Sequence, residues 1–137
     1  RADAMDNDIY RDQILDLYEN PLNFGTLDPA DVSYEEDNPF CGDVIRVDVR
    51  LDDNGRVADI RWSGDGCAIS QASASLLTEE VKGLTLDEVK AFPKERLLEL
   101  VGVPLSMTRV KCALLALKVL KAGVYGLPAP EALRGES

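Results

Sequence analysis

The sequence predicts a single compact α+β domain in which a small three-stranded antiparallel sheet is packed by about five helices. Its 137 residues match the commonest size of a domain with one core. Apolar residues recur at helical spacing near both ends of the chain, and in the middle they alternate with charged residues. No repeat and no long glycine- or proline-rich linker divides the chain. A helix followed by strands and then by helices is typical of the α+β class.

The first predicted element is a short amphipathic helix. It starts at a cap on Asp8, ends at Asn20-Pro21, and has an apolar face formed by Tyr10, Ile14, Leu17 and Tyr18. Residues Arg1 to Ala4 precede Met5 and have the character of an expression remnant. We therefore expect residues 1–8 to form a flexible N-terminus, residues 9–126 the folded domain, and residues 127–137 a C-terminal tail.

Two strands and a tight turn are predicted next. Charged residues alternate with Ile45, Val47, Val49 and Leu51, and again with Ala58, Ile60 and Trp62. The Asn54-Gly55 pair between these segments favours the positive φ angles of a hairpin turn. Val32 to Tyr34 is expected to add a third strand, because an isolated hairpin is rarely stable in water.

The segment before the hairpin is acidic and contains no basic residue. Its carboxylates are Asp28, Asp31, Glu35, Glu36 and Asp37. A solvated loop and edge strand is the simpler interpretation, and a docking surface for a basic partner is the other.

Four helices are predicted after the strands. The first begins at or beside Cys67 and ends at Lys82-Gly83, where a glycine follows a basic last turn. Thr85 and Glu88 have the spacing of a capping box, and Pro93 can open a further helix. The last helix, from about Met107 to Ala122, is expected to be mostly buried. Its polar stripe is narrow and carries Lys111 and Lys118.

Composition excludes several classes of function. With 25 acidic and 15 basic residues the net charge is −10, which repels nucleic acid and anionic membranes. The longest apolar stretch, residues 112–117, is far shorter than the roughly 20 residues of a membrane span. Three cysteines cannot all pair within one chain, so reduced thiols are expected. The sequence therefore predicts a soluble, cytoplasmic protein.

The three cysteines lie in three different contexts. Cys41 lies on a loop that enters a strand, and Cys67 follows a Gly-x-Gly segment at a helix start, where the helix dipole favours a thiolate. Cys112 lies on the mostly buried last helix, whose polar stripe is narrow, so we expect it where the core meets the surface. Arg109 lies three residues before it on nearly the same helical face. The alternative for each cysteine alone is a buried residue that packs as a small hydrophobe.

Together the three thiolates and Asp43 form a four-ligand set that suits zinc or an iron–sulfur cluster. Cys41 and Asp43 are two residues apart, so both side chains point to one side of an extended segment. The chain has no Cys-x-x-Cys pair, so the spacing alone leaves open whether the four share one site. The absence of histidine excludes a Ser-His-Asp triad, and Ser70, Ser73 and Ser75 are expected to be packing residues.

Three motifs carry a resemblance to a known family. The sequences Asn-Pro-Phe-Cys-Gly-Asp-Val-Ile (38–45), Gly-Asp-Gly-Cys-Ala-Ile-Ser-Gln-Ala-Ser-Ala-Ser (64–75) and Arg-Val-Lys-Cys-Ala-Leu-Leu (109–115) resemble the cysteine motifs of the IscU/SufU family, the NifU-like N-terminal domain. The resemblance extends from about Tyr10 to Gly123. It implies a compact α+β fold in which Cys41, Asp43, Cys67 and Cys112 meet at one exposed end.

Three differences from the motifs of its two branches, the scaffold branch and the SufU branch, indicate where the chain lies within that family. Lys111 stands where the scaffold branch has histidine, so Asp43 becomes the expected fourth zinc ligand, as in the SufU branch. The stretch from Leu105 to Arg109 replaces a Leu-Pro-Pro-Val-Lys chaperone motif, so no dedicated Hsp70-type chaperone is expected. The usual SufU insertion between the second and third cysteines is absent, because only residues 68–111 lie there.

The resemblance implies two functions. The favoured one is a scaffold, more a sulfur acceptor than an enzyme, which takes sulfur from a cysteine desulfurase, builds a transient 2Fe–2S cluster on Cys41, Cys67 and Cys112, and passes it to acceptor or downstream assembly proteins. The alternative is a zinc-dependent sulfurtransferase, and a purely structural zinc is a third interpretation. The persulfide carrier is expected to be Cys112 in the scaffold and Cys41 in the transferase. Arg109 steadies the persulfide in both, unless it is simply solvated.

Overall fold

The computed structural model describes residues 2–38 and 42–125, with side chains from residue 11 onward within these ranges. The described part contains three strands and five helices, which confirms the predicted class and the order of elements. In chain order the elements are α1 (Ala2–Glu19), β1 (Val32–Asn38), β2 (Asp43–Leu51), β3 (Val57–Asp65), α2 (Ala68–Glu80), α3 (Leu86–Lys90), α4 (Lys94–Val101) and α5 (Met107–Tyr125).

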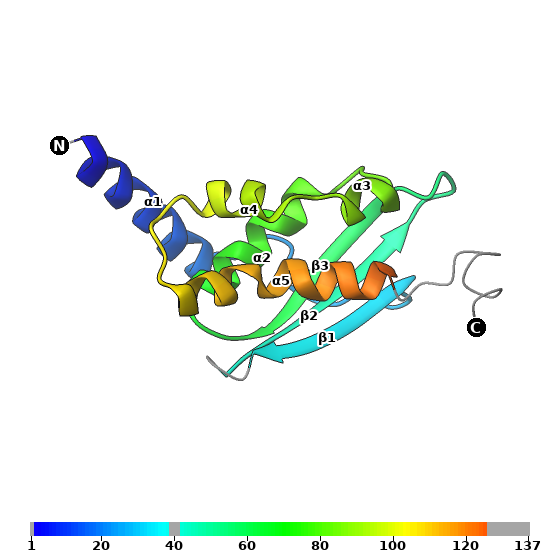
Figure 1. The fold of residues 1–137 in the computed structure, drawn as a ribbon. Helices are drawn as coiled ribbons and strands as arrows, with labels where there is room; N and C mark the ends of the chain where they lie inside the picture. Colours follow the sequence, from blue (N-terminus) through cyan, green and yellow to red (C-terminus); the bar gives the residue numbers. More distant parts are fainter. Residues whose placement is uncertain (1, 39–41, 126–137) are drawn as a thin grey trace.

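The sheet is antiparallel with the order β1-β2-β3. Val47 pairs with Trp62 and Val49 pairs with Ile60, and all four side chains are buried. Helices α2 and α5 lie over this face of the sheet (Figure 1). The alternation seen in the sequence therefore marks the face that the helices cover.

Several element bounds differ from their predictions. Helix α1 begins at Ala2 instead of Asp8, β1 continues to Asn38 instead of Tyr34, and α5 continues to Tyr125 instead of Ala122. The last turn of α5 packs closely on β1, since a Cβ atom added at Gly123 would lie 2.8 Å from Val32 Cγ1. Strand β1 is long because every residue from Val32 to Asn38 pairs with β2.

The β2–β3 turn forms the predicted hairpin, but only part of the predicted geometry is right. Gly55 has a φ of 75°, whereas Asn54 is not among the residues with positive φ. The Asp52 carboxylate accepts hydrogen bonds from the N–H groups of Asn54 (2.8 Å) and Arg56 (3.0 Å). This side chain supports a wider turn with a register shift between Arg50 and Leu51.

The helix starts follow the predicted signals. Cys67 is the N-cap of α2, Thr85 and Glu88 form the capping box of α3, and Pro93 precedes α4. Ser70, Ser73 and Ser75 are buried, as expected for packing residues, and Ser75 Oγ accepts a hydrogen bond from the N–H of Leu22. Within the described ranges, no helix combines the length and apolarity that a bilayer crossing requires.

Asp48 anchors the opposite face of the sheet. Its carboxylate is 1% exposed and accepts hydrogen bonds from Ser33 Oγ, Arg46 Nε (3.0 Å) and the N–H of Leu27 (3.0 Å). Burial raises the pKa of Asp48, but the bonds from Ser33, Leu27 and Arg46 outweigh it, so the pKa lies below its ordinary value. Asp48 therefore ties β1, β2 and the segment before β1 together in its charged form.

Replacing Asp48 with asparagine should lower the free energy of unfolding by about 1–3 kcal/mol at neutral pH, because charge-assisted hydrogen bonds are lost. A carboxyl whose folded pKa is lowered stabilises the fold above its unfolded pKa, near 4, and this contribution disappears as the pH falls through the folded pKa. Urea unfolding should show the full difference from the parent protein at pH 7 and a smaller one below about pH 4. Asp53→Asn in the exposed turn is the control, and a pH-independent difference would contradict the prediction.

Candidate functional site

Asp43 is the first residue of β2, opposite Asn38 at the end of β1. It precedes Ile45 by two residues, so its side chain lies on the helix-covered face of the sheet. The carboxylate is 2% exposed. Within residues 11–38 and 42–125, no lysine or arginine forms an ion pair with it. A buried carboxylate without a cationic partner is costly, so this position favours a bound cation.

Cys67 lies beside Asp43 because it ends the loop after β3. Its backbone N–H donates to Asp43 Oδ1 (3.1 Å), and its Sγ lies 3.6 Å from Asp43 Oδ2. The loop is held by Gln71 Nε2, which donates to the carbonyl of Gly66 (2.9 Å). Gly66 must lack a side chain, since a Cβ atom there would lie 2.8 Å from Asp43 Oδ1 and 2.6 Å from Ser70 Oγ. The Cys67 side chain is partly exposed.

Cys112 lies in the second turn of α5 and is 0% exposed. Its Sγ lies 4.0 Å from Asn38 Nδ2. Cys112 is disulfide-bonded in this structure, so the expectation of reduced thiols is wrong for this residue. The prediction that Cys112 sits where the core meets the surface is wrong, because α5 packs on both α2 and β1 and encloses this side of the helix.

The three residues converge as a potential metal-binding group. One ligand atom each from Asp43, Cys67 and Cys112 lies within 4.8 Å of the others. A tetrahedral zinc with a thiolate and a carboxylate ligand separates their sulfur and oxygen atoms by about 3.6 Å, which matches the Cys67–Asp43 separation of 3.6 Å. Two cysteine sulfurs and a carboxylate also suit iron once the cysteines are reduced. The donor set and its geometry therefore fit a metal ion.

Cys41 lies outside the described residues, so the structure brings together three of the four predicted ligands. The expectation that they meet at one exposed end is wrong for Asp43 and Cys112, which are both buried. Of the three described ligands only Cys67 reaches the surface in part.

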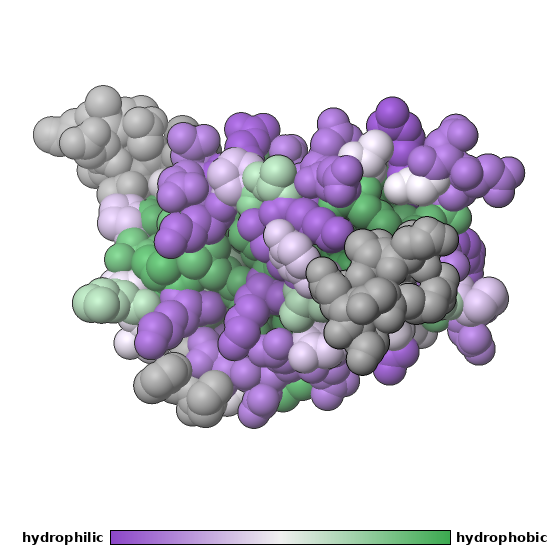
Figure 2. Space-filling model, turned by 45° about the vertical axis from the view of Figure 1, so that its right-hand side comes forward, coloured by the Kyte–Doolittle hydropathy of each residue, from purple (hydrophilic) through white to green (hydrophobic). Residues whose placement is uncertain are grey.

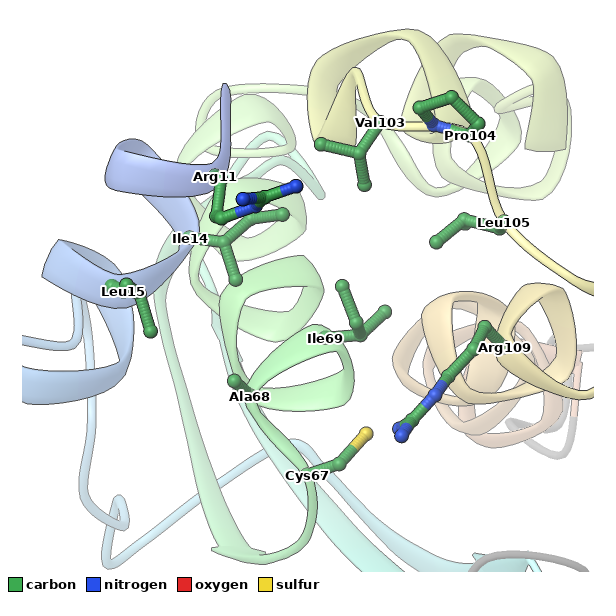
Figure 3. A pocket seen from close by; sticks show the side chains of 10 residues that line it. All are labelled: Arg11, Ile14, Leu15, Cys67, Ala68, Ile69, Val103, Pro104, Leu105 and Arg109. Atoms are coloured by element: carbon green, nitrogen blue, oxygen red, sulfur yellow. The ribbon is translucent and has the colours of Figure 1, made fainter. Parts of the chain in front are cut away.

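The two cations near Cys112 in the sequence have separate positions. Arg109 is exposed in the first turn of α5, and its guanidinium group points toward the sulfur of Cys67 (Figure 3). Lys111 is also exposed. Helical spacing alone does not predict this direction, because it depends on how α5 packs against α2.

Asn38 and Gly66 belong to the site but were not predicted as site residues. Asn38 is buried at the strand end and lies near Cys112 Sγ, and Gly66 gives Asp43 its space. Two features of the sequence could have indicated these residues: Asn38 lies three residues before Cys41, and Gly66 lies directly before Cys67.

Comparison with known proteins identifies similar chains. The family described as NifU-like N terminal domain matches residues 9–132. The iron-sulfur cluster assembly scaffold protein IscU of Haemophilus influenzae is 36% identical over 118 residues, which cover 84% of this chain and 92% of that protein. The zinc-dependent sulfurtransferase SufU of Bacillus subtilis is 35% identical over 133 residues, which cover 85% of this chain and 89% of that protein.

A solved structure has the same fold. The crystal structure of FiSufU, named as an iron-sulfur cluster assembly scaffold protein for the SUF system of Fervidobacterium islandicum AW-1, superposes with a TM-score of 0.69. It is 26% identical in sequence and covers 82% of this chain and 93% of its own.

Replacing Asp43 with asparagine should weaken zinc binding by more than about 10-fold, because even partners behind metal ligands contribute 10–100-fold. Asparagine keeps the size of the side chain and an acceptor for the N–H of Cys67 but removes the charge. Zinc competition titration of reduced protein measures the effect, with the exposed Asp65→Asn as the control. Equal affinities of the parent and the Asp43→Asn protein would remove Asp43 from the ligand set.

Adding a methyl group with Gly66→Ala should also weaken zinc binding, because the new atom would overlap the Asp43 carboxylate and the Ser70 hydroxyl. Backbone strain is not involved, since Gly66 is not among the positive-φ glycines. Zinc titration and thermal unfolding distinguish a displaced ligand from general loss of stability. The exposed Asp65→Asn is again the control, since Gly83 has a φ of 83° and its replacement would add backbone strain.

Proposed function

The chain belongs to the family of NifU-like N-terminal domains, and on that basis we propose that it is an iron–sulfur cluster assembly scaffold. It takes sulfur from a cysteine desulfurase, assembles a labile 2Fe–2S cluster and transfers the cluster to acceptor proteins. The observation that supports this most directly is the convergence of Asp43, Cys67 and Cys112 within 4.8 Å. The scaffold name of the Haemophilus relative supports the same function.

The ligand set suits a cargo that must later leave. The thiolates of Cys41, Cys67 and Cys112 hold the iron, and Asp43 supplies an oxygen. Oxygen is a harder ligand than thiolate and holds iron less tenaciously in a sulfur-rich site. The partial exposure of Cys67 gives iron and sulfur a route to the buried sulfur atom of Cys112 in the reduced protein.

A second function, zinc-dependent sulfurtransfer, is favoured by one specific observation. Asp43 and Cys67 are separated as two ligands of a tetrahedral zinc would be. Zinc, held by Cys41, Asp43, Cys67 and Cys112, would stabilise the thiolates. The Bacillus relative carries this activity in its name. Persulfide is carried by Cys41 in this mechanism and by Cys112 in the scaffold mechanism, with Arg109 beside it. A purely structural zinc is less well supported, because structural sites are closed and Cys67 is partly exposed.

The remaining assignments follow from these two functions. The scaffold is a non-enzymatic sulfur acceptor, whereas the transferase is an enzyme, and both need a desulfurase as partner. A location in the cytoplasm, independence from a dedicated Hsp70-type chaperone, and the bounds of the folded domain stay predictions.

Anaerobic reconstitution should separate the two functions. The reduced protein is incubated with iron, cysteine and a desulfurase, and visible absorption is followed before and after addition of an apo-ferredoxin. A scaffold should develop cluster absorption that moves to the acceptor, and Asp43→Asn should alter the rate of transfer because one ligand is changed. Asp65→Asn is the matched control.

A sulfurtransferase should instead raise desulfurase turnover strongly without holding a cluster, and should lose this effect when zinc is removed. If the protein neither forms a cluster nor stimulates the desulfurase, both proposed functions are wrong.

A further inference from the structure

The two described cysteine ligands differ in how close their sulfur atoms lie to solvent. Cys67 lines a pocket of about 570 Å³ between α1, the start of α2 and the segment that joins α4 to α5 (Figure 3). Most of this lining is apolar, and hydrophobic side chains also reach the surface on the left of Figure 2. Cys112 is completely buried and is not among the residues that line the pocket. Polar groups inside the protein must therefore stabilise the charge on its sulfur when it binds a metal, because a buried charge without partners is costly.

Asn38 presents a side-chain amide from a fixed position at the end of β1. It is the last residue of this strand and pairs with Asp43 of β2. Its carbonyl accepts a hydrogen bond from the N–H of Gly42 (2.8 Å). Pro39 follows it in the sequence, and a residue before proline favours extended backbone angles over helical ones. The backbone of Asn38 is therefore held in place, and only its side chain is free to adjust.

The side chain of Asn38 points toward α5 and the sulfur of Cys112. Alternate residues of a strand share one face of the sheet. Glu36, two residues before Asn38, pairs with Lys118 of α5 (3.1 Å), so this face of β1 lies under the helix. Asn38 is only 6% exposed, and its Nδ2 lies 4.0 Å from Cys112 Sγ. The amide is therefore enclosed between the strand end and the second turn of α5.

A reduced Cys112 would accept a hydrogen bond more readily than its sulfur does in this structure. Here the sulfur is part of a disulfide bond, which carries no charge. A metal-bound thiolate is negatively charged, and hydrogen bonds to charged acceptors are shorter and stronger than those to neutral ones. A separation of 4.0 Å is long for a hydrogen bond, so we expect it to shorten once Cys112 is reduced and holds a metal.

We propose that Asn38 is a positioning residue of the metal site, and that its side-chain amide donates a hydrogen bond to the Cys112 sulfur when this sulfur holds zinc or a cluster iron. The inference rests on the proposed function, which supplies the bound metal. Asn38 is not itself a ligand. Groups that hydrogen-bond to metal ligands orient them and determine how tightly the metal is held. Asn38 does this for the buried sulfur of the site, whereas the sulfur of Cys67 faces the pocket.

The first test detects the hydrogen bond in the unaltered protein by NMR with cadmium-113. Cadmium replaces zinc on cysteine ligands, and its nuclear spin couples to a proton that is hydrogen-bonded to a ligand sulfur. Reduced protein labelled with nitrogen-15 and loaded with cadmium-113 should show this coupling on a side-chain amide. The coupled signal should be missing in Asn38→Leu and in Asn38→Asp, two replacements of similar size that lack the amide.

The outcomes of this test separate the inference from the proposed function. If cadmium binds and no side-chain amide is coupled to it, or if the coupled amide persists in the Asn38 variants, the role of Asn38 is overturned and the metal site stands. If the reduced protein binds neither cadmium nor zinc, the proposed function itself is contradicted.

The second test measures how much the hydrogen bond contributes to metal binding. Asn38→Leu should weaken zinc binding to the reduced protein by about 10-fold or more, the range for partners behind metal ligands. Ser73→Ala is the matched control, because Ser73 Oγ is buried and has no hydrogen-bond partner among the described residues. Circular dichroism of the metal-free proteins selects conditions in which both variants are folded. Equal zinc affinities of the Asn38→Leu and Ser73→Ala proteins would overturn the role of Asn38.

Discussion

The hydrogen bond from the backbone N–H of Cys67 to the carboxylate of Asp43 is the contact on which the site depends. It joins the first residue of β2 to the N-cap of α2, two elements that are otherwise linked through the length of β3. A carboxylate at a helix start is stabilised by the helix dipole, and Gly66 leaves the space that the carboxylate needs. The dipole compensates only part of a buried charge. A bound cation would supply the rest, so metal binding and local stability are coupled here.

Unequal burial gives the ligands different tasks. Asp43 and Cys112 are enclosed by the sheet and α5, while Cys67 reaches the pocket. Enclosed side chains lose little conformational freedom when they bind a metal ion, since packing has already fixed their rotamers. An accessible ligand is the one that can exchange partners. The packing of α5 on α2 and β1 thus holds Asp43 and Cys112 in place and leaves Cys67 as the accessible member of the described group.

Local signals predicted the fold well and the site in part. The strands were predictable because the alternation from Ile45 to Leu51 is a local pattern of apolar and charged residues. The capping box was predictable because Thr85 and Glu88 are only three residues apart. The motifs at Asp43, Cys67 and Cys112 predicted which residues meet. Their exposure was not predictable, because the burial of Cys112 depends on contacts between α5 and elements distant in the sequence. The direction of the Arg109 side chain was not predictable either, because it also depends on how α5 packs against distant elements. The φ angle of Asn54 differed because the Asp52 side chain supports another turn.

The Cys67–Asp43 contact leaves the side chain of Cys67 available as a ligand. The hydrogen bond to Asp43 uses the backbone N–H of Cys67, so the carboxylate stays in place whatever rotamer Sγ adopts, since side-chain rotation leaves the backbone where it is. The proposed scaffold and the alternative sulfurtransferase would both need a carboxylate that stays in place while the cysteine ligands exchange metal or sulfur. The two functions differ in whether the accepted sulfur moves next toward iron or toward another protein.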